Sequence, residues 1–260
     1  MILLKDVGKS YGNKLVFDNA NMSIETAKPT VIMGKNGCGK STLLKIIAGV
    51  LTHTQGEVIR PPKIKISFVP DRFPKLPFKV SEYITHMGKI QGLDDAYIKD
   101  YIDEQFGYLG IPESIKEQKI YKCSKGTIQK INIMQAFLTK PDLLVMDEPF
   151  SGLDESSIEG LIALLAKISK SETAIIISCH EKALAQRVAG NLFVFSGQSI
   201  VKSSDAQDSL CIKFIEEDAS EELREIFVEK DRLKETLLSL LSAGHEIHSV
   251  NPISQRKTDA

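Results

Sequence analysis

A glycine-rich stretch of the chain ends in a lysine and a serine, a combination suited to binding phosphate. Residues 34–41 read GKNGCGKS and match the pattern G-x-x-x-x-G-K-[ST]. Glycines in such a loop let backbone N–H groups turn towards phosphate oxygens, and the N-terminus of a following helix adds partial positive charge. Lys40 could then reach the β- and γ-phosphates of a nucleotide, and the Ser41 hydroxyl could bind Mg²⁺. The stretch predicts a nucleoside triphosphate site.

The residues around this loop help to decide between a phosphate site and an ordinary glycine-rich turn. Residues 30–33 are β-branched or apolar, which predicts a buried strand, and residues 42–48 predict a helix that stops at Gly49. Strand, loop and helix therefore follow one another in the order that a phosphate loop requires, and this context favours the phosphate site.

A pair of acidic residues follows a second short apolar run. Residues 143–146 predict a buried strand, and Asp147 and Glu148 come directly after it. Side chains at the carboxyl end of a parallel strand point into the ligand crevice of an open α/β sheet. Two adjacent carboxylates there are costly unless a cation or a substrate uses them. An ordinary exit from a strand is the alternative, but the phosphate loop upstream favours a Mg²⁺ ligand.

Three further residues are weaker candidates when each is considered alone. Tyr11 lies at a predicted turn and could stack on a purine, although packing at a hairpin edge is the simpler interpretation. His180 follows the predicted strand 174–178 at the same sheet edge as the acidic pair, in a position where a histidine is usually structural. Ser124 is suited to cap a predicted helix at residues 128–138.

Composition and charge limit the class of protein. The 260 residues carry a formal net charge of −1, so no overall field attracts the chain to nucleic acid or to a membrane. We expect no signal peptide and no membrane-spanning segment. The four cysteines are widely scattered, which predicts a reducing cytoplasm. Residues 205–260 contain 13 acidic and 7 basic residues, a net charge of −6, which predicts a separate C-terminal segment.

Hydrophobic spacing and turn residues predict the remaining elements of an α/β chain. An apolar stripe through Tyr97 and Tyr101 predicts core packing of one helix. The predicted strands are residues 2–7, 16–24, 56–60, 63–69, 192–195, 199–202, 212–215 and 225–228. The predicted helices are residues 80–89, 94–109, 155–169 and 231–242.

Taken together, the order and spacing of these motifs resemble the ATP-binding-cassette (ABC) ATPases over about residues 1–204. The resemblance implies that residues 34–41 are the Walker A loop and residues 143–148 the Walker B strand with its following glutamate. Residues 151–154 match the D-loop. The family signature LSGGQ falls on residues 123–127.

The resemblance also implies a role for each residue of the site. The catalytic residues would be Lys40, Glu148 and His180, the last as the switch histidine. Mg²⁺ would be bound by Ser41, Asp71 and Asp147. ATP would be bound by Tyr11, which stacks on adenine, and by Gly34, Asn36, Gly37, Cys38, Gly39, Lys40, Ser41, Thr42, Asp71, Ser124 and Gly126.

Two positions depart from the family pattern. The signature keeps Ser124 and Gly126 but has Cys123, Lys125 and Thr127 in place of leucine, the first glycine and glutamine. The resulting SKG form resembles export-type cassettes. The glutamine of the Q-loop is replaced by Asp71, which is charged, shorter by one methylene and without an amide donor.

The implied fold is a P-loop NTPase core sheet with an N-terminal antiparallel β-subdomain, an inserted helical subdomain at about residues 78–124 and a small C-terminal α/β extension at residues 205–260. The implied function is that of an ABC transporter ATPase subunit. It would power a separate membrane permease, with import and export both open and only the SKG form pointing to export. It would pair with a second cassette, identical or different, at the inner face of the membrane. No nucleic-acid partner is expected.

Two other functions remain open at this point. One is a soluble cassette without a transport role, such as an iron–sulfur assembly factor. The other is an ATP-binding regulator that does not hydrolyse ATP, and the presence of Lys40, Glu148 and His180 argues against it.

Overall fold

The computed structural model describes residues 1–260 except 27, 171, 204–208, 216–222, 230–232 and 253–260. Its centre is a six-stranded sheet in the order β5-β6-β7-β3-β8-β9, in which only β9 is antiparallel to its neighbour. The strands are β3 (Thr30–Met33), β5 (Ile66–Val69), β6 (Leu143–Met146), β7 (Ala174–Cys179), β8 (Asn191–Ser196) and β9 (Ser199–Lys202). The predicted hairpin of β8 and β9 is confirmed.

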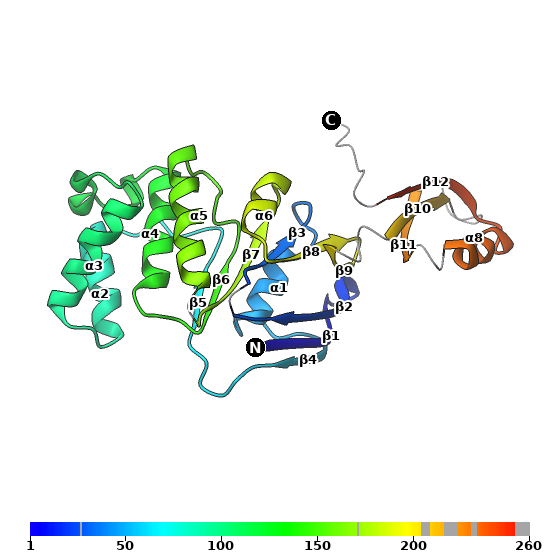
Figure 1. Ribbon diagram of the computed structural model, residues 1–260, viewed down its shortest axis with the longest axis horizontal. Coiled ribbons are helices and arrows are strands. Elements are labelled where there is room, and N and C mark those ends of the chain that lie inside the picture. The colour runs from blue at the N-terminus through cyan, green and yellow to red at the C-terminus, as the bar shows by residue number, and fades with distance from the viewer. Residues whose placement is uncertain (27, 171, 204–208, 216–222, 230–232, 253–260) are drawn as a thin grey trace.

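The central strands are covered on both faces, which explains their uninterrupted apolar sequences. On one face Val145 and Ile176 pack with α1 (Lys40–Ile47) and with the N-terminal strands. On the other face Leu144 and Ile177 pack with the helices α5 (Glu155–Ser169) and α6 (Lys182–Val188). Helix α5 has the bounds predicted from the sequence, whereas α6 was missed. Figure 1 shows α1 and α5 on either side of the sheet.

A second, antiparallel sheet in the order β2-β1-β4 lies beside the central sheet. It consists of β1 (Ile2–Tyr11), β2 (Lys14–Ile24) and β4 (Gln55–Ile59). The first two strands are longer than predicted because only Gly12, with a φ of 56°, and Asn13 form the turn between them. Phe17 of β2 packs edge-on against Phe195 of β8, with ring centroids 6.0 Å apart, and so joins the two sheets.

A helical block separates β5 from β6 in sequence. It contains α2 (Val80–Ile90), α3 (Asp95–Tyr108), two short 3₁₀ turns and α4 (Lys125–Phe137), and it has its own apolar core. A Cβ on Gly88 would lie 2.6 Å from Ile98, so α2 and α3 approach closely. One detail of the predicted stripe is wrong: Tyr97 is 47% exposed and stacks on Tyr101 at the edge of the core.

The C-terminal elements form a third sheet, in the order β11-β10-β12. Its strands are β10 (Ser209–Ile215), β11 (Leu223–Glu229) and β12 (Glu246–Pro252), with α8 (Leu233–Ser242) between the last two. Figure 1 shows this sheet beyond β8 and β9. The predicted boundary at residues 204 and 205 lies outside the described residues, and β12 was not predicted. The α/β fold class with its helical insertion and C-terminal extension is confirmed.

Candidate functional site

The phosphate loop lies between β3 and α1, as the sequence predicts, but the helix begins earlier. Helix α1 starts at Lys40, so Lys40 and Ser41 belong to its first turn and are fixed by its backbone. Gly37 and Gly39 have φ angles of 81° and 115°, a left-handed backbone that glycine adopts without strain. A Cβ on Gly39 would also lie 2.9 Å from Val16. The loop therefore needs glycine at both positions.

Three oxygen atoms surround the buried ammonium group of Lys40, which is only 5% exposed. Its Nζ donates to the carbonyl oxygens of Gly34 at 2.8 Å and Lys35 at 3.2 Å, and lies 3.2 Å from Oε1 of Glu148. Residues of the phosphate loop and Glu148, which follows β6, thus both contact the ammonium group of Lys40. An anionic group that enters the loop can take the place of the Glu148 carboxylate beside Lys40.

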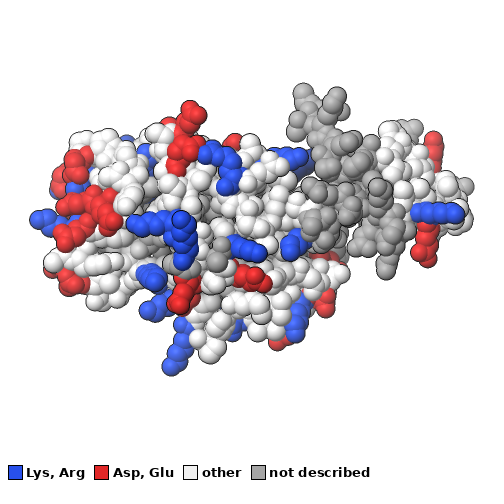
Figure 2. Space-filling view, in the orientation of Figure 1, with Lys and Arg blue, Asp and Glu red and all other residues white. Residues whose placement is uncertain are grey.

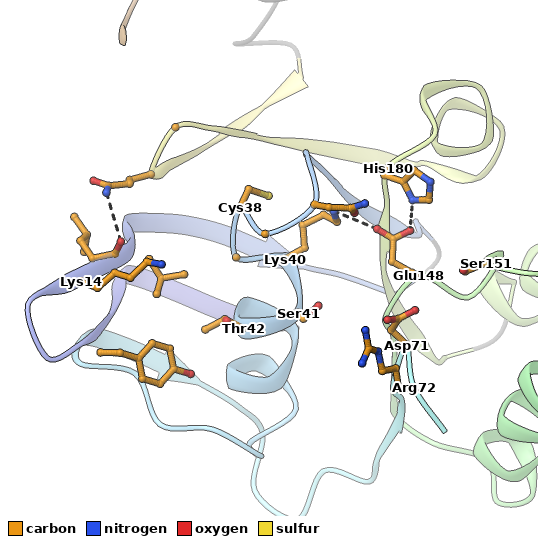
Figure 3. Close-up of a pocket in the computed structure, with 18 of the residues that line it drawn as sticks. Lys14, Cys38, Lys40, Ser41, Thr42, Asp71, Arg72, Glu148, Ser151 and His180 are labelled. Atoms are coloured by element: carbon orange, nitrogen blue, oxygen red, sulfur yellow. Dashed lines mark hydrogen bonds and ion pairs between the residues drawn. The ribbon is translucent and has the colours of Figure 1, made fainter. Parts of the chain in front are cut away.

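Glu148 lies between Lys40 and His180. Its Oε2 is 2.7 Å from Nδ1 of His180, a residue that follows β7. In the tautomer with a proton on Nδ1, His180 donates this bond and orients the carboxylate. Glu148 has a φ of 49°, a left-handed backbone that is strained for a non-glycine residue and recurs at functional sites. Figure 3 shows the three side chains converging above the phosphate loop.

Ser178 of β7 orients both acidic residues, and the sequence analysis missed it. Its hydroxyl donates to Oδ1 of Asp147 at 2.6 Å and accepts from the backbone N–H of Glu148 at 2.9 Å. Asp147 itself is 3% exposed, so this bond partly offsets the cost of burying its carboxylate. The signal in the sequence was a single hydroxyl near the end of an otherwise apolar strand.

A cavity of about 870 Å³ opens over the phosphate loop. Its lining includes eleven predicted residues: Tyr11, Asn36, Gly37, Cys38, Gly39, Lys40, Ser41, Thr42, Asp71, Glu148 and His180. It also includes residues that the sequence analysis did not assign to the site: Lys14, Leu15, Val16, Arg72, Lys125, Ser151, Gly197 and Gln198. The structure thus brings the main predicted motifs to one cavity (Figure 3).

Two of the predicted residues reach the cavity from different sheets. Tyr11 ends β1 and is 53% exposed, and Nζ of Lys9 lies 4.8 Å from its ring centroid. Asp71 and its neighbour Arg72 follow β5, and Figure 3 shows them below Glu148. A carboxylate and a guanidinium group therefore lie side by side at the position to which the resemblance assigns a neutral glutamine.

The signature residues begin α4. Ser124 is its N-cap, as predicted, and its hydroxyl accepts from the backbone N–H of Thr127 at 3.1 Å. A Cβ on Gly126 would lie 2.5 Å from the carbonyl oxygen of Gly152, so glycine is needed where α4 meets the D-loop. The side chain of Lys125 reaches the same loop and donates to the Ser151 hydroxyl at 3.0 Å.

Cys38 is the predicted nucleotide-binding residue that carries a thiol. Its side chain is partly buried in the phosphate loop. Burial raises the pKa of the Cys38 thiol, while the charge of Lys40 acts in the opposite direction. The thiol is therefore protonated at neutral pH and adds no negative charge beside bound phosphate.

The fold and this site define a P-loop nucleotide-binding protein, and comparison with known proteins is more specific. A family model described as "ABC transporter" matches residues 17–151. The zinc import ATP-binding protein ZnuC of Rickettsia bellii is 32% identical over 70% of this chain and 76% of its own length. The tungstate uptake system ATP-binding protein TupC of Peptoclostridium acidaminophilum is 32% identical over 76% of this chain and 95% of its own.

Solved structures agree at the level of the fold. An ATP-binding subunit of an ABC transporter has a TM-score of 0.70 at 22% identity, covering 80% of this chain and 92% of that one. A dimeric ATP-binding cassette bound to ADP and Pi also has a TM-score of 0.70, at 23% identity, covering 78% and 98%. The chain belongs to the ABC transporter family, as an ATP-binding subunit and an ATPase. Among the described residues, no helix is long and apolar enough to cross a membrane.

Proposed function

We propose that this chain hydrolyses ATP in the cavity over the phosphate loop and thereby powers a separate membrane permease. The observation that carries the proposal is the position of Glu148, held between Lys40 and His180 at 3.2 and 2.7 Å directly over the loop. A carboxylate so placed can orient and deprotonate a water molecule next to the terminal phosphate.

Each residue of the site has a role in this proposal. Tyr11 stacks on adenine, the backbone N–H groups of residues 34–42 bind the phosphates, and Lys40 exchanges the Glu148 carboxylate for phosphate oxygens. The released Glu148 then acts on water, and His180 keeps its carboxylate oriented. Catalysis comes mainly from positioning and from charge stabilisation, because phosphoryl transfer asks little covalent chemistry of the protein.

The oxygen donors proposed for Mg²⁺ are Ser41 and Asp71, which line the cavity, and Asp147, which is 3% exposed and is not among the lining residues. The Ser41 hydroxyl and the carboxylates of Asp71 and Asp147 are hard oxygen donors of the kind that Mg²⁺ prefers. Asp147 is held by Ser178, which supports a ligand role through a bound water. When bound, Mg²⁺ neutralises charge on the β- and γ-phosphates.

The signature residues carry the proposal of a head-to-tail pair of cassettes. Helix α4 begins at Ser124, and its N-terminal partial charge would act on the ATP held by the second subunit. Gly126 would allow a close approach of that phosphate. The chain would therefore work as a dimer at the inner face of a membrane, bound to its permease.

The names of the relatives bear on the direction of transport. The SKG form of the signature resembles export-type cassettes, whereas ZnuC and TupC are named as import and uptake proteins. Export therefore has no support from these relatives, and the proposal is ATP-driven transport without an export direction. The iron–sulfur assembly alternative is likewise not favoured by relatives named as transport subunits.

Two measurements test the proposal. Glu148→Gln should bind ATP at least as well as the wild type, because Lys40 loses an anionic competitor, and should hydrolyse ATP at least about a hundredfold more slowly. Hydrolysis at the wild-type rate would remove Glu148 from its role. Purification of the chain from membranes should also recover a polytopic membrane protein, and recovery without any such partner would contradict a transport role.

A further inference from the structure

A row of amide side chains runs along α4 towards the site, and its two members nearer the site are buried. Gln129, Asn132 and Gln135 are spaced three residues apart, so they lie on one face of the helix. Asn132 is fully buried and Gln129 is 4% exposed. Burying neutral amides is costly unless they are hydrogen-bonded, so the partners of these side chains indicate what the row does.

The row ends at the two loops that carry the acidic residues of the site. Nδ2 of Asn132 donates to the carbonyl oxygen of Pro70 at 2.8 Å, and Pro70 directly precedes Asp71. Nε2 of Gln129 donates to the carbonyl oxygen of Pro149 at 3.3 Å, and Pro149 directly follows Glu148. One helix therefore holds the backbone next to both carboxylates.

The other end of the row reaches the helical block. Nε2 of Gln135 donates to Oδ1 of Asn132 at 3.0 Å, and Oε1 of Gln135 accepts from the hydroxyl of Tyr83 on α2. The Tyr83 ring packs edge-on against Phe73, which lies two residues beyond Asp71, with centroids 5.5 Å apart. Every hydrogen bond from Tyr83 to Pro70 is donated in the same direction, so the bonds polarise one another.

We propose that four residues, together called the amide row, are positioning residues for ATP hydrolysis. The amide row consists of the three amides Gln129, Asn132 and Gln135 and of Tyr83, which donates to Gln135. The amide row fixes the loops of Asp71 and Glu148 relative to each other and to α2. The inference rests on the proposed function of Glu148 and adds residues that touch neither nucleotide nor metal. Most of the proposed ATP-binding residues belong to the phosphate loop, so the amide row acts mainly on kcat and leaves KM for ATP nearly unchanged.

The chain offers a matched control for a test by mutation. Tyr101 of α3 is a second tyrosine whose hydroxyl donates to α4, to the carbonyl oxygen of Met134 at 2.6 Å, and it is buried whereas Tyr83 is partly buried. Tyr83→Phe and Tyr101→Phe both remove one hydroxyl bond between the helical block and α4. Only the first bond belongs to the amide row.

The experiment measures kcat, KM for ATP and Tm of the full chain. Tyr83→Phe should lower kcat by about threefold to tenfold with KM within about twofold, because small misplacements at a reacting centre are costly. Gln135→Met should lower kcat by about tenfold. The double variant Tyr83→Phe/Gln135→Met should have the same kcat as Gln135→Met alone, because both changes break the hydrogen bond between Tyr83 and Gln135. Tyr101→Phe should lower Tm but keep kcat within about twofold.

Three outcomes would overturn the inference: wild-type kcat in Tyr83→Phe, an equal loss of kcat in Tyr101→Phe, or additive effects in the double variant. Failure of the proposed role of the amide row can be distinguished from failure of the proposed function. If Glu148→Gln is inactive and Tyr83→Phe is normal, only the amide row loses its role. If Glu148→Gln is fully active, the site itself is wrongly assigned.

Discussion

Asp71 occupies the position at which the resemblance to ABC ATPases leads us to expect the Q-loop glutamine. Its carboxylate lines the cavity together with Arg72, Ser41 and Glu148, so a bound triphosphate would meet an additional negative charge. Repulsion between two like charges that share a partly closed cavity is substantial unless a cation lies between them. Figure 3 shows the Arg72 side chain beside this carboxylate.

We predict that ATP binding depends more steeply on Mg²⁺ in this chain than in its Asp71→Gln variant. The amide removes the repulsive charge, so the variant should bind ATP more nearly equally with and without Mg²⁺. Asp71→Ala should behave in the same way while hydrolysing ATP more slowly, because a metal ligand is lost. ATP affinity titrated across Mg²⁺ concentrations checks this. Superimposable curves for the three proteins would place Asp71 outside the metal site.

At the scale of the elements, Asp154 starts α5 directly after the D-loop. Its Oδ1 accepts from the Ser157 hydroxyl at 2.5 Å, from the backbone N–H of Ser157 at 2.8 Å and from the Ser156 hydroxyl at 2.9 Å. The Ser157 hydroxyl, then these other bonds, lowers the pKa of Asp154 from 3.8 to about 2. The folded chain thus stabilises the ionised form of the Asp154 carboxyl group relative to the unfolded chain.

The depressed pKa gives α5 a stability that depends on pH. The contribution is complete above the unfolded pKa of 3.8 and is lost as pH falls towards about 2. Asp154→Ala should therefore lower Tm at pH 7, and the difference from the wild type should shrink as pH falls below 4. Asp154→Asn keeps an oxygen acceptor without a charge, and neither variant titrates at this position, so the Tm difference between Asp154→Asn and Asp154→Ala should depend little on pH. A constant Tm difference for Asp154→Ala from pH 7 to pH 3 would contradict the assignment.

Elements whose evidence is local were predictable from the sequence. Helix α5 and the strands β3 and β6 have the predicted bounds because strong apolar periodicity and capping residues define them. Helix α6 has only seven residues, and β12 gains its partner from β10, far away in sequence. Neither α6 nor β12 therefore has a local sequence pattern strong enough to predict it.

The site followed the same division. Lys40, Glu148 and His180 were predictable because motifs fix them at the carboxyl ends of parallel strands, which meet at one edge of the sheet. Ser178 and the amide row were not, because most of their partners lie 20 or more residues away in the sequence. A polar residue in a buried helix indicates that it has a hydrogen-bond partner, but the sequence does not identify that partner.

At the scale of the whole molecule, the C-terminal sheet is built from its own strands. β10 pairs with β11 and β12, and α8 lies against the last two of these strands. Residues 205–260 carry a net charge of −6, whereas the complete chain carries −1. The face of the body in Figure 2 mixes both signs of charge. Every residue of the nucleotide cavity lies at or before Gln198.

We therefore predict that a chain ending at residue 203 folds and binds ATP with unchanged affinity. The C-terminal segment would instead contact a partner or regulate activity, since Leu238 and Leu241 of α8 are 59% and 56% exposed. Large exposed apolar side chains that lie together are suited to a protein contact. ATP affinity and Tm of the shortened chain, compared with the full chain and with Leu238→Ser/Leu241→Ser, check the prediction. The double variant should keep ATP affinity and alter only association or the ATPase rate. A shortened chain that does not fold, or that loses ATP affinity, would make the segment part of the core.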